Sequence, residues 1–443
     1  MTRKTVALIL SLFFSTETTV YAENLLDIYQ IALQADPTLR AAQAALESGE
    51  QAVPIAIAQM LPTFSGSAST TGHDDTGIPL GTKYNTNVYG LSLTQPILHR
   101  EHWALLNQAK HKKYLALATY ELAVQNLILR VAERYFSVLG AEDEVTFTIA
   151  QRKAFERQLE QTQQRFDVGL IAITDVDEAR ARRDDAIARE IAAKNELADR
   201  FEQLREITGF QIDHISAVKS NIDLLPPSPN DMEAWVGMAN QHNVDLEIAK
   251  ERAYVAKAEI ANQSAGHWPY VDGSASYQSS RDARNLSPYD TRLLAKSATL
   301  SLNVPIFQGG GVVFKTKQAR ANYDEAQENY EVQLRTTDST ARQSFRGVLT
   351  EISSVKALQQ SVVSNESALK ATQAAYEVGT RTVVDVLDAE SSLLNAVKNH
   401  AQARYRYILE GLRLKKAAGS LSGEDLYQTN SLLEVDSSSS RKR

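Results

Sequence analysis

Two carboxylates, Asp385 and Asp388, stand three positions apart just after a glycine-containing turn in a chain that otherwise reads as long helices. Helical residues three apart lie on the same face, so both side chains would point in one direction. Arg381 and Tyr376 add a fixed positive charge and a hydroxyl close by in the sequence. Such a group could attract cations or tie one helix to another, although two aspartates on a helix are most often a solvated surface.

A near copy of this stretch occurs upstream, at 165–179, with the sequence RFDVGLIAITDVDEA. Gly169 corresponds to Gly379, and Asp175 corresponds to Asp385. In each copy a glycine ends one helical pattern, and an aspartate stands near the start of the next. A turn that is used twice with different side chains predicts a pseudo-symmetric helical end with a polar constriction.

The duplication extends over almost the whole chain. Leu91 corresponds to Leu300 and Thr208 to Ala418, at an offset that changes little over about 200 residues. The predicted division is a signal peptide at 1–22, a first repeat at 23–209, a linker or equatorial segment at 210–230, a second repeat at 231–419 and a tail at 420–443. The linker contains Pro-Pro-Ser-Pro and is expected to cross the surface, and the polar tail is expected to be disordered.

Each repeat predicts the same four elements: a helix, a β-hairpin, a very long helix and a last helix. They fall at about 25–60, 63–97, 101–168 and 174–208 in the first repeat, and at about 231–267, 270–307, 312–378 and 384–418 in the second. At 1.5 Å per residue the long helices would span roughly 100 Å. The two shorter helices of a repeat could stack end to end beside the long one, so the chain predicts four helical columns.

The hairpin segments alternate between apolar and polar residues. Leu91 and Leu93 share one face, whereas Ser92 and Thr94 share the other. This pattern is typical of a membrane β-barrel strand, and we favour it over a soluble two-layer sheet because no second β-layer is available to cover the strands. Four strands are fewer than the roughly eight that the smallest barrels need, and an open edge cannot lie in lipid. We therefore predict an oligomer of two, three or four copies.

Composition makes several other classes unlikely candidates for this chain. It has 443 residues, no Cys and a formal net charge of −7, so we expect no disulfide, thiol nucleophile, Cys-linked lipid anchor or basic nucleic-acid-binding surface. Arg3 and Lys4 precede an apolar run, and Ala22 is suited to cleavage, as in a secretory signal peptide. Beyond it, no run of about 18 apolar residues predicts a transmembrane helix.

The residues do not predict an enzyme. We find no Ser/His/Asp grouping at a strand-to-helix elbow, and His99 with His102 lacks a third positioned metal ligand. The sequence therefore predicts no catalytic residue and no cofactor. A periplasmic coiled-coil adaptor or structural protein without a pore is the alternative to a channel, and the alternating strands argue against it.

The motif at 376–389, YEVGTRTVVDVLDA, together with its partner at 165–176, resembles the TolC family of outer-membrane efflux and secretion channels. The resemblance covers the chain up to about Gly419, including the duplication and both hairpins. It implies an all-α periplasmic barrel continuous with a twelve-stranded β-barrel of a homotrimer in outer-membrane lipid. It also implies an exit duct for tripartite drug-efflux pumps and type I secretion, with a periplasmic adaptor (membrane fusion protein) and an inner-membrane ABC or RND-type pump as partners.

The same resemblance implies two groups of site residues. Arg381 would bind Thr174 and its neighbours, and Tyr376 would bind Asp175, so that the inner helix pair stays closed. The implied gate and selectivity residues are Asp385, Asp388, Arg381, Tyr376, Thr174 and Asp175. The residues implied to receive the adaptor are Val168, Gly169, Leu170, Val378, Gly379 and Thr380.

Overall fold

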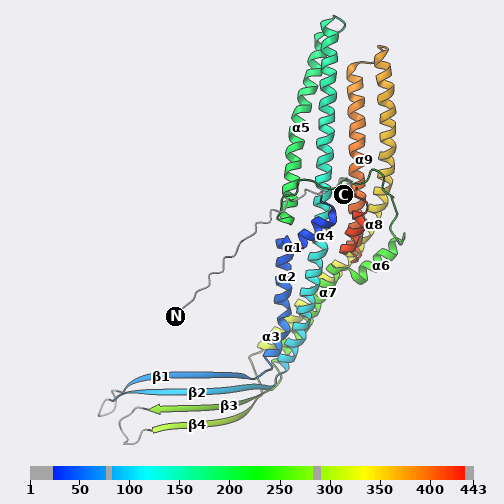
Figure 1. The fold of residues 1–443 in the computed structure, drawn as a ribbon. Coiled ribbons are helices and arrows are strands. Elements are labelled where there is room, and N and C mark those ends of the chain that lie inside the picture. The colour runs from blue at the N-terminus through cyan, green and yellow to red at the C-terminus, as the bar shows by residue number, and fades with distance from the viewer. Residues whose placement is uncertain (1–22, 76–81, 283–290, 435–443) are drawn as a thin grey trace, which may run out of the picture.

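The computed structural model describes residues 23–75, 82–282 and 291–434 (Figure 1). Long helices run to one end of the molecule, a four-stranded sheet extends from the other end, and short helices gather around the middle. The predicted signal peptide, 1–22, lies outside the described residues, and its cleavage stays a prediction.

Two very long helices form the frame of the molecule. α4 (Arg100–Asp167) has 68 residues and α8 (Gly311–Glu377) has 67, so each rises roughly 100 Å along its axis. Each is followed by a shorter antiparallel helix, α5 (Ile173–Thr208) after α4 and α9 (Val383–Ala417) after α8. The two resulting helical hairpins have their turns at the same end of the molecule (Figure 1).

The first helix predicted in each repeat is divided in the structure. The helix predicted at 25–60 is α1 (Leu25–Ala35), α2 (Pro37–Glu50) and α3 (Ala52–Ala58). The helix predicted at 231–267 is α6 (Met232–His242) and α7 (Val244–Ala265). The stacked columns are therefore built from shorter pieces than the sequence periodicity indicated.

Helix caps and a proline explain these breaks. Asp36 accepts a hydrogen bond from the Leu39 N–H at 2.9 Å, and the corresponding Asn243 accepts one from the Leu246 N–H at 3.0 Å. A cap residue takes an extended backbone, so it interrupts the helix although the apolar pattern continues on both sides. Pro54, in the first turn of α3, lacks the N–H that would bond to the carbonyl of Glu50 at the end of α2. This missing bond accounts for the break between α2 and α3.

The sheet is an antiparallel meander in the order β1-β2-β3-β4. Its strands are β1 (Thr63–Asp75), β2 (Thr82–Leu98), β3 (Tyr270–Asp282) and β4 (Thr291–Asn303). The second hairpin was predicted to reach residue 307, but β4 ends at Asn303, shortly before Pro305, which has no N–H for a ladder bond. Within the described part of the chain, β1 and β4 each have one edge without a partner strand.

The two faces of the sheet differ in polarity, as the alternation predicts. Ser65 and Ser92 place their hydroxyls 2.7 Å apart on one face, and Ser276 and Ser297 place theirs 2.8 Å apart in the same row. The opposite face carries exposed apolar side chains: Phe64, Tyr89, Leu91, Leu93, Tyr277, Leu300 and Leu302. A single protomer thus presents a broad apolar sheet face that another surface must cover.

The densest apolar core lies near the middle of the molecule, where α1, α4, α5 and α9 meet. Tyr135, Leu127 and Ile128 of α4 are fully buried there, together with Leu25 and Ile28 of α1. By length and composition alone α4 could cross a membrane, but it packs along α2, α5, α7 and α9 instead.

The segment 210–230 belongs to this core, so the prediction of a simple surface linker is wrong. Ile212, Ile215 and Val218 are buried in the central cluster. Ile215 forms a parallel bridge with Glu23, and Val218 forms an antiparallel bridge with Leu433. The isoleucines recur between polar residues, a pattern that surface loops do not need.

The predicted disorder of the tail is also wrong for 420–434. α10 (Gly423–Asn430) begins with a capping box formed by Ser422 and Asp425, and Leu426 is fully buried. This short helix packs against α1, so its order depends on a distant part of the chain. Residues 435–443 lie outside the described ranges.

Candidate functional site at the paired helical tips

The two helical hairpins turn in the same way. Gly169 follows the end of α4 with a φ of 76°, and Gly379 follows the end of α8 with a φ of 79°. In each turn the glycine N–H and the next N–H donate to carbonyls of the last helical turn, at 2.8 and 2.9 Å in the first hairpin and at 3.0 Å in the second. This helix end requires a left-handed residue, which glycine supplies without steric strain.

The residues predicted to receive a partner all lie at these turns. Val168, Leu170 and Val378 have 70, 72 and 75% of their surface exposed. The Thr380 hydroxyl donates to the Ala375 carbonyl at 3.0 Å and so supports its turn. The tips therefore present apolar side chains that no described part of this chain covers.

Asp385 caps the start of α9. Its carboxylate accepts hydrogen bonds from the Thr382 N–H at 2.8 Å and the Thr382 hydroxyl at 2.9 Å. These bonds lower the pKa of the Asp385 carboxyl, and the positive charge of Arg381 lowers it further. The corresponding helix α5 begins at Ile173, and its N-cap residue, Ala172, supplies no side-chain cap, so the two hairpins differ at this point.

Arg381 does not make the link that the family resemblance implies. Its guanidinium lies 3.6 Å from the Asp385 carboxylate, one turn further along the same segment. It thus pairs within its own hairpin rather than with Thr174 of α5. A role for Arg381 in joining helices would need contacts outside this protomer.

Tyr376 also lacks the expected partner within the chain. Its hydroxyl is buried and has no hydrogen-bond partner among the described residues, and the Arg165 guanidinium lies 4.6 Å from the centre of its ring. Tyr376, Asp175 and Arg381 do line one cavity of about 240 Å³ between the hairpins. The structure therefore brings these three predicted residues together without joining them.

Asp388 makes a contact that the sequence analysis missed. Its Oδ1 accepts a hydrogen bond from Nη1 of Arg182 at 2.9 Å, which ties α9 to α5. Nη2 of Arg182 lies 3.6 Å from Glu178, one turn earlier on its own helix. The repeat could have pointed to this group, because Glu178 and Asp388 stand at the same offset as Asp175 and Asp385.

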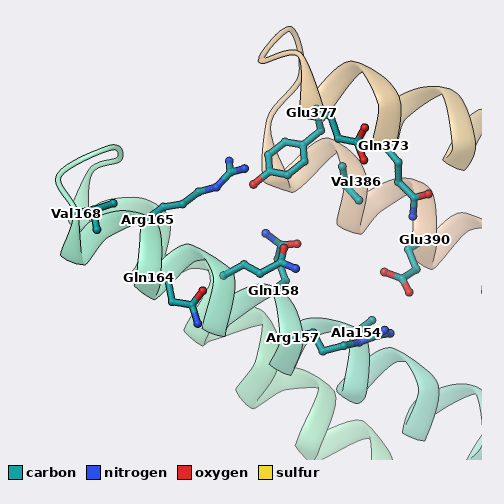
Figure 2. A pocket seen from close by; sticks show the side chains of 12 residues that line it. Ala154, Arg157, Gln158, Gln164, Arg165, Val168, Gln373, Glu377, Val386 and Glu390 are labelled. Carbon is teal, nitrogen blue, oxygen red and sulfur yellow. The ribbon is translucent and has the colours of Figure 1, made fainter.

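A second and larger cavity of about 730 Å³ separates the hairpins below the tips (Figure 2). Arg165 and Arg157 enter it from α4, and Glu377 and Glu390 enter it from the α8–α9 side (Figure 2). Burial raises the pKa of the Glu390 carboxyl, and the charge of Arg157 offsets part of this rise. The hairpins thus face each other across polar side chains rather than across a closed apolar seam.

This arrangement fits movement better than bond-making chemistry. An apolar contact near the tips joins Phe155, Ala186 and Leu387 from α4, α5 and α9. Other contacts between the hairpins at this end include the partly solvated pair of Arg182 and Asp388, which is worth little, and the Arg165 guanidinium over the Tyr376 ring. In the described part of the chain, no group of three His, Asp or Glu side chains could hold a metal.

Comparison with known proteins identifies the class. The family model described as outer membrane efflux protein matches residues 28–210 and 235–420, one segment in each repeat. The chain therefore belongs to the outer membrane efflux protein family. It is an outer-membrane channel protein whose helical part extends into the periplasm, as the fold class and localisation predictions stated, and the adaptor alternative is not supported.

Individual relatives agree with this assignment. The chain is 37% identical over 422 residues to the outer membrane protein TolC of Escherichia coli K12, covering 93% of this chain and 85% of that protein. It is 29% identical over 441 residues to the proteases secretion protein PrtF of Dickeya chrysanthemi, covering 97% of this chain and 95% of that protein. The crystal structure of the Campylobacter jejuni CmeC outer membrane channel superposes with a TM-score of 0.77 at 18% identity, covering 93 and 90%, which supports the fold.

Proposed function

We propose that this chain acts as a homotrimeric, gated exit duct for efflux and type I secretion. Its tips would dock a periplasmic adaptor that connects it to an inner-membrane ABC or RND-type pump, and it would catalyse no reaction itself. The observation that carries the proposal is the combination of a sheet with two unpaired edges at one end and paired apolar turns at the other. The name of the Dickeya chrysanthemi relative supports proteins as one class of cargo.

The sheet supports assembly into one barrel. An edge strand cannot lie in lipid with its N–H and C=O groups unpaired, so β1 of one copy would pair with β4 of the next. Three copies of the four-stranded sheet, as the family resemblance implies, would give twelve strands, more than the roughly eight of the smallest barrels. The apolar face would then contact outer-membrane lipid, and the serine-bearing face would line the water-filled lumen.

The tips support a gate. Asp385 and Asp388 of three copies around one axis would form two carboxylate rings that attract cations into the constriction. Arg381 and Tyr376 would act between copies, toward Thr174 and Asp175 of a neighbour, since these links do not form within the chain. Opening would then move α9 outward with its hairpin.

A substitution in the second turn tests the docking proposal. Val378→Arg would place a charge among exposed apolar tip residues without changing the adjacent left-handed glycine. After cross-linking in cells, purification of the unaltered protein should recover an adaptor and a pump, and the variant should recover at least tenfold less of both. Mass spectrometry of the two samples measures this difference.

Val363→Arg is the matched control, because Val363 lies on the same helix and is 52% exposed, away from the turn. Both variants should migrate as heat-modifiable oligomers if the barrel still assembles. Equal recovery of the adaptor with Val378→Arg would contradict docking at the tips. Recovery of no inner-membrane protein with the unaltered chain would contradict the exit-duct proposal.

A further inference from the structure

We propose that Arg182 exchanges between two carboxylates when the gate moves, neutralising Asp388 in the closed state and returning to Glu178 in the open state. Asp388 would then become a free charge only on opening, whereas Asp385 would keep the partners of its own hairpin. This inference rests on the proposed gating function and adds a residue on α5 that determines the charge of the constriction.

The contacts of Arg182 permit such an exchange. Its two terminal nitrogens face different carboxylates, Nη1 toward Asp388 at 2.9 Å and Nη2 toward Glu178 at 3.6 Å. Glu178 is on the same helix, one turn away, so this partner stays within reach wherever α9 moves. The Arg182 side chain is 35% exposed, and water can therefore enter the group during the exchange.

The two carboxylates of α9 differ in where their partners come from. Asp385 is bound by Thr382 and approached by Arg381, and both belong to the same hairpin as Asp385 itself. These partners move with Asp385, so separation of the two hairpins leaves its contacts with Thr382 and Arg381 in place. Asp388 depends on α5 of the other hairpin, and separation of the hairpins removes its cation.

The nearby positive charges do not replace Arg182 at Asp388. Arg165 and Arg381 line the 240 Å³ cavity that Arg182 also lines. However, Arg165 lies over the Tyr376 ring, and Arg381 pairs with Asp385. An open gate would thus present Asp388 without a cation partner, whereas in a closed gate Arg182 neutralises it. Because cations would bind the open state better, they would favour opening in proportion to this difference in affinity.

Single-channel recording in planar lipid bilayers separates the exchange from a merely structural contact. Arg182→Gln removes the partner of Asp388 and should raise the resting conductance. Glu178→Gln removes the competing partner, so Arg182 should stay bound to Asp388. The resting conductance should then fall. Arg182 and Glu178 lie on adjacent turns of α5, and the exchange predicts effects of opposite sign when each is replaced by Gln.

The cation sensitivity gives a second readout. In an Asp385→Asn background, Asp388 forms the remaining carboxylate ring. Arg182 should neutralise this ring, so Mg²⁺ added at the tip side should block the channel only weakly. Adding Arg182→Gln should strengthen this block at least fivefold. The exchanged pair Arg182→Asp with Asp388→Arg should restore the resting conductance. Arg180→Gln is the control, since Arg180 pairs with Asp177 on the outer part of the same helix at 3.3 Å.

Three outcomes decide the matter. Conductance changes of opposite sign with Arg182→Gln and Glu178→Gln support the exchange. Changes of the same sign, or a block that Arg182→Gln leaves unaltered in the Asp385→Asn background, overturn it while the channel itself stands. Unaltered protein that forms no pore overturns the proposed function and the exchange with it.

Discussion

The Tyr405 hydroxyl donates a hydrogen bond to Oδ2 of Asp143 at 2.7 Å and thereby joins α9 to α4 at the base of the two hairpins. The Tyr405 ring also stacks on Phe136, with 5.7 Å between ring centres. Burial raises the pKa of Asp143, although the Tyr405 hydrogen bond and the charge of Arg404 act in the opposite direction. This buried contact contrasts with the solvated pair of Arg182 and Asp388 near the tips, so the base would act as the fixed end during opening.

Removal of the hydroxyl should loosen the base. Tyr405→Phe keeps the ring stacking but leaves the partly buried Asp143 without its donor, at a cost of about 1–3 kcal/mol. Hydrogen exchange of the surrounding α9 amides should accelerate roughly tenfold or more, since about 1.4 kcal/mol corresponds to tenfold. Tyr427→Phe, at an exposed position, is the control. Unchanged exchange rates in α9 would show that the contact does not hold the base.

The Glu390 carboxyl should make closure depend on pH. Its pKa is raised above the usual 4.5 by burial, so the closed arrangement favours the protonated form. The resulting stabilisation is present at low pH and is lost as pH rises through the raised pKa. The resting conductance of the unaltered channel should therefore fall as the pH is lowered toward the raised pKa.

Glu390→Gln should remove this part of the pH response and lower the resting conductance at pH 7. Glu160→Gln, at an exposed position on α4, should leave the response intact. Conductance recorded at several pH values on both variants measures the difference. A pH response that persists in full with Glu390→Gln would assign it to other groups.

The cap of α9 should be worth more than its counterpart on α5. Thr382→Ala removes a hydroxyl that donates to the Asp385 carboxylate and accepts a hydrogen bond from the Asp385 N–H. Its loss should cost about 0.5–2 kcal/mol. Amide exchange in the first turn of α9 should accelerate severalfold. Thr336→Ala, which removes an exposed hydroxyl that donates to the Val332 carbonyl within α8, is the control. Because the pKa of Asp385 is lowered, the contribution of the cap should be lost only as pH falls below the usual range of aspartate.

Both carboxylate rings together should account for cation sensitivity. Asp385→Ala with Asp388→Ala should abolish block by multivalent cations added from the tip side in planar bilayers, because no ring of free or releasable charge remains. Asp177→Ala, an exposed carboxylate on α5, should leave the block unchanged. Persistence of the block in the double variant would place cation binding elsewhere in the duct.

The links expected between copies should act together. Arg381→Ser with Tyr376→Phe should raise the resting conductance severalfold, since each lost hydrogen bond is worth about 0.5–3 kcal/mol. Tyr376→Phe alone tests whether a neighbouring copy binds the Tyr376 hydroxyl, because this hydroxyl has no partner among the described residues of its own copy. No effect of Tyr376→Phe on conductance would show that no neighbouring copy supplies a partner.

The local features of the chain could be read from its sequence. A left-handed position after a long helix strongly favours glycine, so Gly169 and Gly379 locate both turns. The alternation around Leu91 and Ser92 likewise gives the faces of the sheet, because side chains of a strand point to opposite sides at successive residues. The breaks at Asp36 and Asn243 were also encoded locally, but the continuing apolar periodicity concealed them.

The partners of each charge were decided by the tertiary structure. Asp388 meets Arg182, which stands more than two hundred positions away, and Tyr376 meets Arg165 rather than Asp175. Short-range rules describe the backbone and the face of a helix, whereas an ion pair depends on which long helices pack together and at what height. For the same reason the burial of Ile215 and Leu426 became evident only once distant segments were packed around α4.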